Sequence, residues 1–254
     1  MKGKFMVADG VRSILENKGL SYHANNSIYE AMVAYAELAG STIGDIRAGL
    51  IDELEGAFTD VLYAMVIDRQ NDPNSRDTPR RLARMYINEL YAGRYYPEPK
   101  ITAFPNDKPQ GLGKSLPSSG DTYHFNNLLV VQSPFISNCS HHHQIVRGVA
   151  YVGILPGKKL IGLSKYTRLV QHLAARGTLQ EELTIDIAEA LESKTDSPDI
   201  AVTLFARHGC CENRGIRSPN SQTTTAEMRG KFMTNPNLRK EFYDNVQMLR
   251  SESK

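Results

Sequence analysis

Apolar residues recur every three or four positions from residue 43 to residue 65, which places them on one face of a long α-helix. The positions are Ile43, Ile46, Leu50, Leu54, Ala57, Phe58, Val61, Leu62 and Met65. Gly44, Gly49 and Gly56 interrupt this segment, and each weakens a helix by roughly 1 kcal/mol relative to alanine. We therefore expect the helix to depend on packing against a partner, such as another subunit.

Shorter helices are predicted on both sides of the long one. Ser27–Glu30 has the S-x-x-E form of a capping box, and an alanine-rich run follows it as far as Gly40. Further along, Thr78 and Pro79 have the form of an N-cap and a first helical residue, opening a helix that ends at Gly93. The first third of the chain is thus predicted to be helical.

The pattern changes after residue 126. Leu128–Gln132 and Val146–Leu155 are predicted as strands around a turn, and Ile200–Ala206 as a further strand. Ser164–Ala175 and Gln180–Leu191 are predicted as helices. Strands and helices in segregated groups predict an α+β domain behind the helical N-terminal region.

Composition excludes several classes of protein. With 254 residues, 41% hydrophobic and 23% charged, the chain is typical of a globular protein. A net charge of +2 is too small to indicate a nucleic-acid partner. Since no apolar stretch approaches the roughly 20 residues of a membrane span and no secretory signal is visible, we expect a cytoplasmic protein with no membrane partner. Three cysteines, at 139, 210 and 211, are then expected to be reduced thiols.

Two Cys/His clusters follow predicted strands. One is Cys139–His143, with the sequence CSHHH, and the other is His208–Cys211, with the sequence HGCC. Ordinary cysteines and surface histidines would explain each cluster taken alone. If the strand ends meet, however, the clusters offer the mixed nitrogen and sulfur ligands that zinc takes, in a closed four-ligand site or an open three-ligand one.

Basic residues form a second group of candidates. Lys165 and Arg168 share a face of a predicted helix, Arg214 follows the second Cys/His cluster, and Arg80 and Arg81 lie near the start of the Thr78 helix. Taken singly, each is most simply a solvated charge. If they converge, they indicate a polyanion such as a triphosphate, because guanidinium groups bind phosphate oxygens in pairs.

Five ordered motifs, followed by Arg214-Gly215 and a threonine-rich segment, resemble GTP cyclohydrolase I. The motifs are Thr78–Tyr86, Cys139–His142, Gly162–Arg168, Gln180–Thr184 and His208–Cys210, and the threonines are Thr223–Thr225. The resemblance covers roughly residues 76–246, and the proline- and glycine-rich segment at 105–123 looks like an insertion. It implies a helical N-terminal region over residues 1–75 and a catalytic domain over residues 76–254.

The resemblance implies a T-fold (tunnelling-fold) α+β subunit that assembles into a ring, typically a homodecamer of two pentamers with sites between subunits. The implied reaction is the zinc-dependent hydrolysis of GTP at C8 to 7,8-dihydroneopterin triphosphate and formate. The product would feed folate, pterin or 7-deazaguanine biosynthesis.

By position within the motifs, the resemblance also assigns roles. The implied zinc ligands are Cys139, His142 and Cys210. The implied catalytic residues are His141, His208 and Ser164, with the two histidines as acid and base and Ser164 near the ribose. The implied substrate-binding residues are Gln180, Glu181 as the guanine anchor, and Lys165, Arg168, Arg214 and Arg81 around the triphosphate.

The sequence departs from the family pattern at three places. Ser140 stands where a glutamate is usual, Glu182 where an arginine is usual, and His143 where an apolar residue is more common. One alternative is thus a variant that stops at a ring-opened formamide or prefers another purine triphosphate. A second is a non-catalytic nucleotide-binding protein, against which the complete set of zinc ligands and acid–base residues argues.

Overall fold

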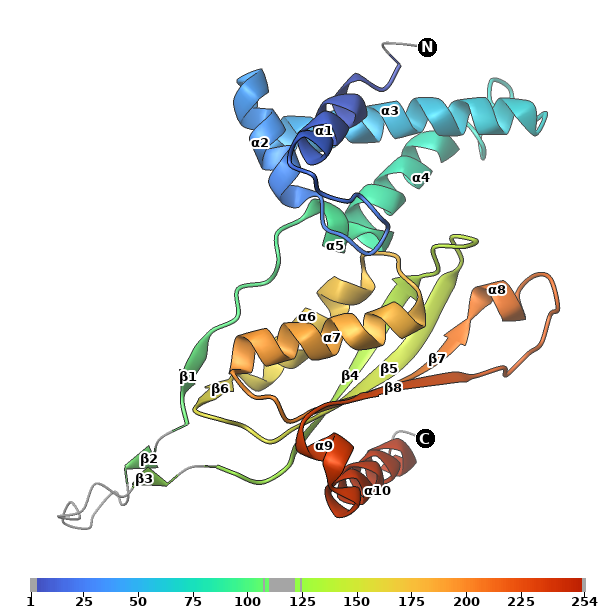
Figure 1. The fold of residues 1–254 in the computed structure, drawn as a ribbon. Coiled ribbons are helices and arrows are strands. Elements are labelled where there is room, and N and C mark those ends of the chain that lie inside the picture. Colours follow the sequence, from blue (N-terminus) through green and yellow to red (C-terminus); the bar gives the residue numbers. More distant parts are fainter. Residues whose placement is uncertain (1–3, 107, 110–121, 124, 253–254) are drawn as a thin grey trace. The chain divides into compact units, whose positions relative to one another are not determined.

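A computed structural model describes residues 4–106, 108–109, 122–123 and 125–252 (Figure 1). The chain forms two compact units. Met1–Pro97 with Ala175–Gly177 make up the N-terminal unit, and Glu98–Ala174 with Thr178–Lys254 make up the sheet unit. Within the described residues, no helix is long and apolar enough to cross a membrane.

The N-terminal unit is helical, as predicted. Its elements are α1 (Met6–Asn17), α2 (Tyr29–Ala39), α3 (Ile43–Ala64), α4 (Thr78–Met85), the π-helical segment η1 (Tyr86–Leu90) and α5 (Ala92–Tyr95). The predicted long helix is α3, and it finds its packing partners inside this unit. Ile46 joins Val11 and Met32 in one core, and Ile51 joins Ala83 and Ile87 in another.

Two predicted helix starts are wrong. The capping box lies at α3, where Thr42 accepts a hydrogen bond from the Asp45 N–H and Asp45 accepts one from the Thr42 N–H. At Ser27–Glu30 no such box forms, because α2 begins one residue later than predicted, with Ile28 as its N-cap. The Ser27 hydroxyl accepts from the Tyr29 N–H (3.3 Å) and donates to the Arg94 carbonyl (3.3 Å). The N-cap of α4 is Asp77 rather than Thr78.

The predicted helix end at Gly93 is also wrong. After α4 the backbone widens into η1, where the Tyr91 N–H bonds to the Tyr86 carbonyl five residues back (3.0 Å). Gly93 then lies inside α5, and its N–H donates to the Ala175 carbonyl. The division into compact units falls after Pro97, because α4 packs against α3. The N-terminal region over residues 1–75 and the catalytic domain over residues 76–254 stay predictions.

The sheet unit contains a four-stranded antiparallel sheet in the order β4-β5-β7-β8. Its strands are β4 (Leu129–Asn138), β5 (Ile145–Ile154), β7 (Ile200–His208) and β8 (Thr223–Met228). Two short antiparallel pairs accompany it, namely β1 (Ala103–Pro105) with β6 (Lys159–Ile161) and β2 (Lys108–Pro109) with β3 (Thr122–Tyr123). The expected insertion at 105–123 therefore includes strand residues, and its positions 107 and 110–121 lie outside the described residues.

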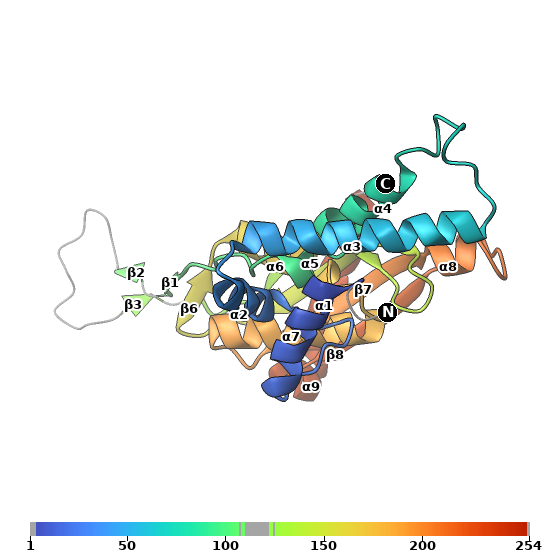
Figure 2. The same ribbon diagram turned by 90° about the horizontal axis from the view of Figure 1, so that it is seen from above.

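Helices cover both faces of this sheet (Figures 1 and 2). They are α6 (Leu163–Ala174) and α7 (Gln180–Thr195) on one face and α9 (Lys231–Thr234) and α10 (Pro236–Glu252) on the other, while α8 (Gly209–Glu212) follows β7. Alternate residues of each strand face opposite sides, so Leu204 packs toward α7 whereas Phe205 packs toward α10. The α+β architecture is confirmed, and β4 continues six residues past the predicted end at Gln132.

Candidate functional site

The two Cys/His clusters meet at one end of the sheet. Cys139 follows the last residue of β4, and His208 is the last residue of β7. Between these strands runs β5, whose residue Val146 pairs with His208. The Cys139 thiol lies near enough to the Cys210 thiol to contribute to its raised pKa. The sheet register therefore brings together the strand ends that the sequence left far apart.

The thiol pair fits a zinc ion in ligand type. Burial, together with the neighbouring thiols of Cys211 (Sγ–Sγ 3.9 Å) and Cys139, raises the pKa of the Cys210 thiol to about 11. A thiol with this pKa stays protonated at neutral pH unless a bound metal ion removes its proton, as metal ions do for coordinating cysteines.

The expected third ligand stands apart from the thiols. His142 lies on the exposed turn between β4 and β5, beside His141 at a ring-centroid separation of 6.4 Å. Among the residues that the structure describes, no three His, Cys, Asp or Glu side chains stand close enough together to hold a metal ion. The structure thus assembles two of the three expected ligands.

His208 is tied to the first residue of α7. Its Nε2 lies 2.7 Å from Oε1 of Gln180, whose side chain is buried. The Gln180 Nε2 faces the carbonyl oxygens of Leu204 (3.4 Å) and Thr223 (3.3 Å) and the hydroxyl of Thr225 (3.1 Å). Gln180 therefore links α7, β7 and β8 to the histidine.

The charge around His208 comes from two carboxylates. Burial lowers the pKa of His208, while Glu181 and Glu212 oppose this effect through their negative charge. The exposed Glu181 directly follows Gln180, whose side chain contacts His208. A half-buried histidine beside an exposed carboxylate suits proton transfer to a bound polar ligand.

The remaining predicted site residues are more dispersed. Ser164 and Arg168 are exposed on α6, and the Lys165 ammonium donates to the Lys100 carbonyl (2.9 Å). Arg214 is exposed after α8. Arg81 belongs to the N-terminal unit, where its guanidinium lies 3.9 Å from Asp77. Convergence of these basic residues stays a prediction.

The threonines around Gln180 were not predicted to be functional residues. Thr225 belongs to the threonine-rich segment that contributed to the resemblance, yet strand β8 was not predicted there. The alternation of Thr223, Thr225 and Glu227 could have indicated this strand, since alternate residues of a strand share a face. Thr184, one helical turn after Gln180, completes the group.

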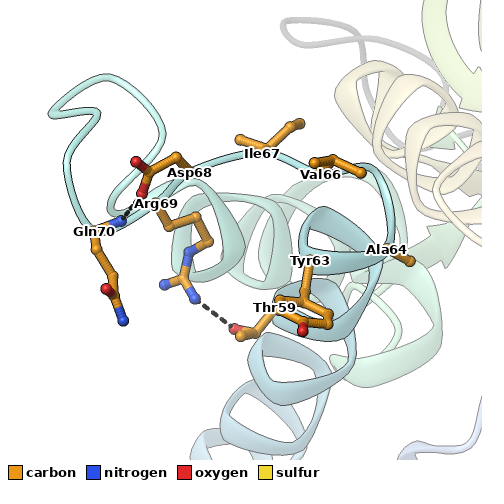
Figure 3. Close-up of a pocket in the computed structure, with 8 residues that line it drawn as sticks. All are labelled: Thr59, Tyr63, Ala64, Val66, Ile67, Asp68, Arg69 and Gln70. Atoms are coloured by element: carbon orange, nitrogen blue, oxygen red, sulfur yellow. Dashed lines mark hydrogen bonds between the residues drawn. The ribbon is translucent and has the colours of Figure 1, made fainter.

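An open pocket of about 760 Å³ lies in the N-terminal unit at the end of α3 (Figure 3). Its lining residues are Thr59, Tyr63, Ala64, Val66, Ile67, Asp68, Arg69 and Gln70. The Arg69 guanidinium donates to the Thr59 hydroxyl across it (3.2 Å). None of the predicted site residues lines this pocket.

Comparison with known proteins identifies the family. The family model described as GTP cyclohydrolase I matches residues 54–247. Proteins named GTP cyclohydrolase 1 from Shewanella putrefaciens and Shewanella sp. (strain W3-18-1) are 36% identical over 193 residues, which is 75% of this chain and 83% of each relative. The relative from Shewanella baltica (strain OS185) is equally similar over 82% of its length. The chain therefore belongs to the GTP cyclohydrolase I family.

Proposed function

We propose that the protein is a zinc-dependent GTP cyclohydrolase I that hydrolyses GTP at C8 to 7,8-dihydroneopterin triphosphate and formate. The observation that carries this proposal is the gathering of Cys139, Cys210, His208 and Gln180 at one end of the sheet. Glu181 lies beside this group. A nucleotide-binding protein without catalysis would have no use for a pair of thiols next to a half-buried histidine.

Cys139, Cys210 and His142 would hold the zinc ion. When bound, zinc supplies Lewis-acid activation of water. The two thiols are close enough to influence each other's protonation, so ligation requires the short turn that carries His142 to bring its imidazole toward them. Three protein ligands leave one position open, as in other hydrolytic zinc sites.

Glu181 would select guanine. A carboxylate accepts hydrogen bonds from the guanine N1–H and 2-amino group together, whereas adenine offers no such donor pair. Because Glu181 influences His208 electrostatically, the bound base would lie within reach of the histidine. His208 would then move a proton at the imidazole ring of guanine, and His141 and Ser164 would serve the later proton transfers at the opened ring and the ribose.

Lys165, Arg168, Arg214 and Arg81 would bind the triphosphate. The exposed arginines in this set retain donors for phosphate oxygens, which guanidinium groups bind in a bidentate manner. Arg81 comes from the N-terminal unit.

The subunits would assemble into a ring, in the family's usual form a decamer of two pentamers. The sheet supports this proposal because its outer strands, β4 and β8, pair on one side only among the described strands. Unpaired strand edges are surfaces on which a neighbouring sheet continues. Light scattering should report a mass many times 28.3 kDa, and a stable monomer with full activity would refute shared sites.

Turnover of GTP tests the proposal directly. Zinc-loaded protein is incubated with GTP, and formate release is compared with the fluorescence of the oxidised neopterin product. Equal amounts of both are expected, with ATP as the control substrate. Loss of GTP without fluorescence would indicate a ring-opened product, and absence of turnover in zinc-loaded protein would refute the cyclohydrolase assignment.

A further inference from the structure

Two threonine hydroxyls support the contact between Gln180 and His208 through hydrogen bonds to Gln180. The Thr184 hydroxyl donates to the main-chain carbonyl of Gln180 at 2.7 Å, and it also lies 2.7 Å from the Thr225 hydroxyl. The Thr225 oxygen in turn lies 3.1 Å from Nε2 of Gln180. These contacts form a continuous chain from α7 through β8 to the side chain that holds His208.

The direction of each hydrogen bond in this chain follows from the chemistry of its members. A hydroxyl has a single proton, and that of Thr184 is used on the Gln180 carbonyl, which can only accept. Thr225 must therefore donate its own proton to Thr184, which leaves its lone pairs to accept from the Gln180 amide NH₂. One arrangement of protons satisfies all three groups.

The groups around the Gln180 amide also fix its orientation. Its nitrogen faces three acceptors, the Thr225 hydroxyl oxygen and the backbone carbonyls of Leu204 and Thr223. Turning the amide over would set its oxygen against two carbonyls that cannot donate. Since Gln180 and Thr184 are 5% and 2% exposed, water offers little compensation for such a mismatch. Oε1 of Gln180 therefore faces His208.

We propose that Thr225 is a positioning residue that, through Gln180, holds neutral His208 with its proton on Nε2. Oε1 of Gln180 can only accept, so the imidazole nitrogen 2.7 Å away must donate. The lone pair of the neutral ring is then on Nδ1. On the proposed function, on which this last step rests, Nδ1 is the nitrogen that exchanges protons with the substrate.

A structural role for Thr225 would have different consequences. The hydroxyl pair also joins β8 to α7, and loss of that link alone would lower stability without changing the protonated nitrogen of His208. The two roles are separated by Thr225→Val, which keeps the side-chain shape and removes the hydroxyl, and by Thr225→Ser, which restores it. Thr224→Val is the matched control, because Thr224 is the exposed neighbour on the same strand.

The experiment records nitrogen-15 solid-state spectra of the full, histidine-labelled chain at about pH 8, where an ordinary histidine is neutral. The His208 signals are assigned by their disappearance in His208→Asn. The wild type and Thr224→Val should show a proton on Nε2 only. Thr225→Val should show an added population with the proton on Nδ1, because only the two longer contacts, to the Leu204 and Thr223 carbonyls (3.4 and 3.3 Å), then orient the Gln180 amide. Thr225→Ser should return the wild-type spectrum. With GTP, Thr225→Val should lower kcat about fivefold to tenfold with KM changed less than about twofold.

Three outcomes would overturn the proposal. They are a wild-type His208 protonated on Nδ1, an unchanged spectrum in well-folded Thr225→Val, and a loss of kcat that Thr225→Ser fails to rescue. If Thr225→Val does not fold, Gln180→Met replaces it, since removal of Oε1 should likewise release the Nδ1–H form. A protein that shows the expected spectra but no GTP turnover would refute the proposed function and leave the role of Thr225 in place.

Discussion

Glu182 closes the start of helix α7 by accepting a hydrogen bond from the Thr178 hydroxyl at 2.6 Å. The Leu179 N–H, one of the helix's unpaired donors, points at the same carboxylate oxygen (3.4 Å). The preceding residue, Glu181, is exposed and acts electrostatically on His208. The two adjacent glutamates therefore interact with different groups. Glu182 binds residues at the start of α7, and Glu181 acts electrostatically on His208.

Substitution should separate these two roles. Glu181→Ala is expected to lower kcat/KM for GTP by about tenfold or more, because it leaves two guanine donors unpaired at about 1–3 kcal/mol each. Glu182→Ala is expected to lower the free energy of unfolding by about 1 kcal/mol, as loss of a helix cap does, with turnover nearly unchanged. Steady-state kinetics and urea unfolding measure both. A larger kinetic loss in Glu182→Ala would place the guanine contact one residue further along the helix.

The zinc content of the protein should depend on the thiols of Cys139 and Cys210. Cys139→Ala and Cys210→Ala each remove one of the two thiol ligands proposed for zinc, and elemental analysis should find most of the zinc lost. Cys211→Ala is the matched control on the neighbouring residue and should retain the metal. His142→Ala should also lose zinc, because the proposed set has only three protein ligands. Equal retention in Cys210→Ala and Cys211→Ala would refute this ligand set.

The sequence predicted the elements whose pattern is strong and local. Helix α3 and the β4–β5 hairpin were identified because their apolar periodicity continues for many residues. Strand β8 was missed because its threonines carry no apolar alternation, and its place in the sheet depends on pairing with β7, twenty residues earlier. The helix start at Ser27 was wrong by one residue, since Ile28 is the N-cap, and the Ser27 hydroxyl bonds both to the Tyr29 N–H and to the distant Arg94 carbonyl.

The candidate site could likewise be predicted only in part from the sequence. The motif residues Cys139, His208 and Cys210 could be identified from the sequence, and the sheet register brings them together as expected for strand ends. The bond between Gln180 and His208 could not be derived, since it depends on how α7 packs over β7. The supporting role of the Thr225 hydroxyl could not be derived either. Alternating threonines on an edge strand have the same sequence pattern as ordinary solvent-exposed residues.

The capping box of α3 should make stability depend on pH in the acid range. Hydrogen bonds from the Thr42 side chain and backbone lower the pKa of Asp45. A carboxyl group whose pKa is lower in the folded state stabilises that state above its unfolded pKa, and this contribution disappears as the pH falls through the folded value. The stability difference between wild type and Asp45→Ala should therefore be constant near neutral pH and shrink below about pH 4.

Urea unfolding at a fixed protein concentration, repeated across this pH range, measures that difference. Thr42→Val is the companion variant, because it removes the side-chain hydrogen bond that contributes most to the lowered pKa. It should reduce the pH dependence that Asp45 provides. A stability difference for Asp45→Ala that stays constant down to about pH 2 would show that the carboxylate charge has no part in the cap.

Two glycines of α3 should respond oppositely to alanine. At Gly56 an added Cβ would meet nothing within 4 Å, so Gly56→Ala should raise the free energy of unfolding by about 0.5–1 kcal/mol through helix propensity. At Gly49 the added Cβ would lie 2.8 Å from a methyl carbon of Val7 on α1. That helix is held against α3 by the Glu53 carboxylate, which accepts from the Val7 N–H, so α1 cannot simply move away.

Gly49→Ala should therefore lower the free energy of unfolding by about 1–3 kcal/mol, as overpacking of a core does. The double variant Val7→Ala with Gly49→Ala provides the control, because shortening Val7 makes room for the new methyl group. Residues in contact are coupled, so the double variant should be more stable than the sum of the two single changes predicts. If the changes in the free energy of unfolding are strictly additive, Gly49 is not needed for the close approach of α1. The low helix propensity of Gly49 would then not be offset by better packing between α1 and α3.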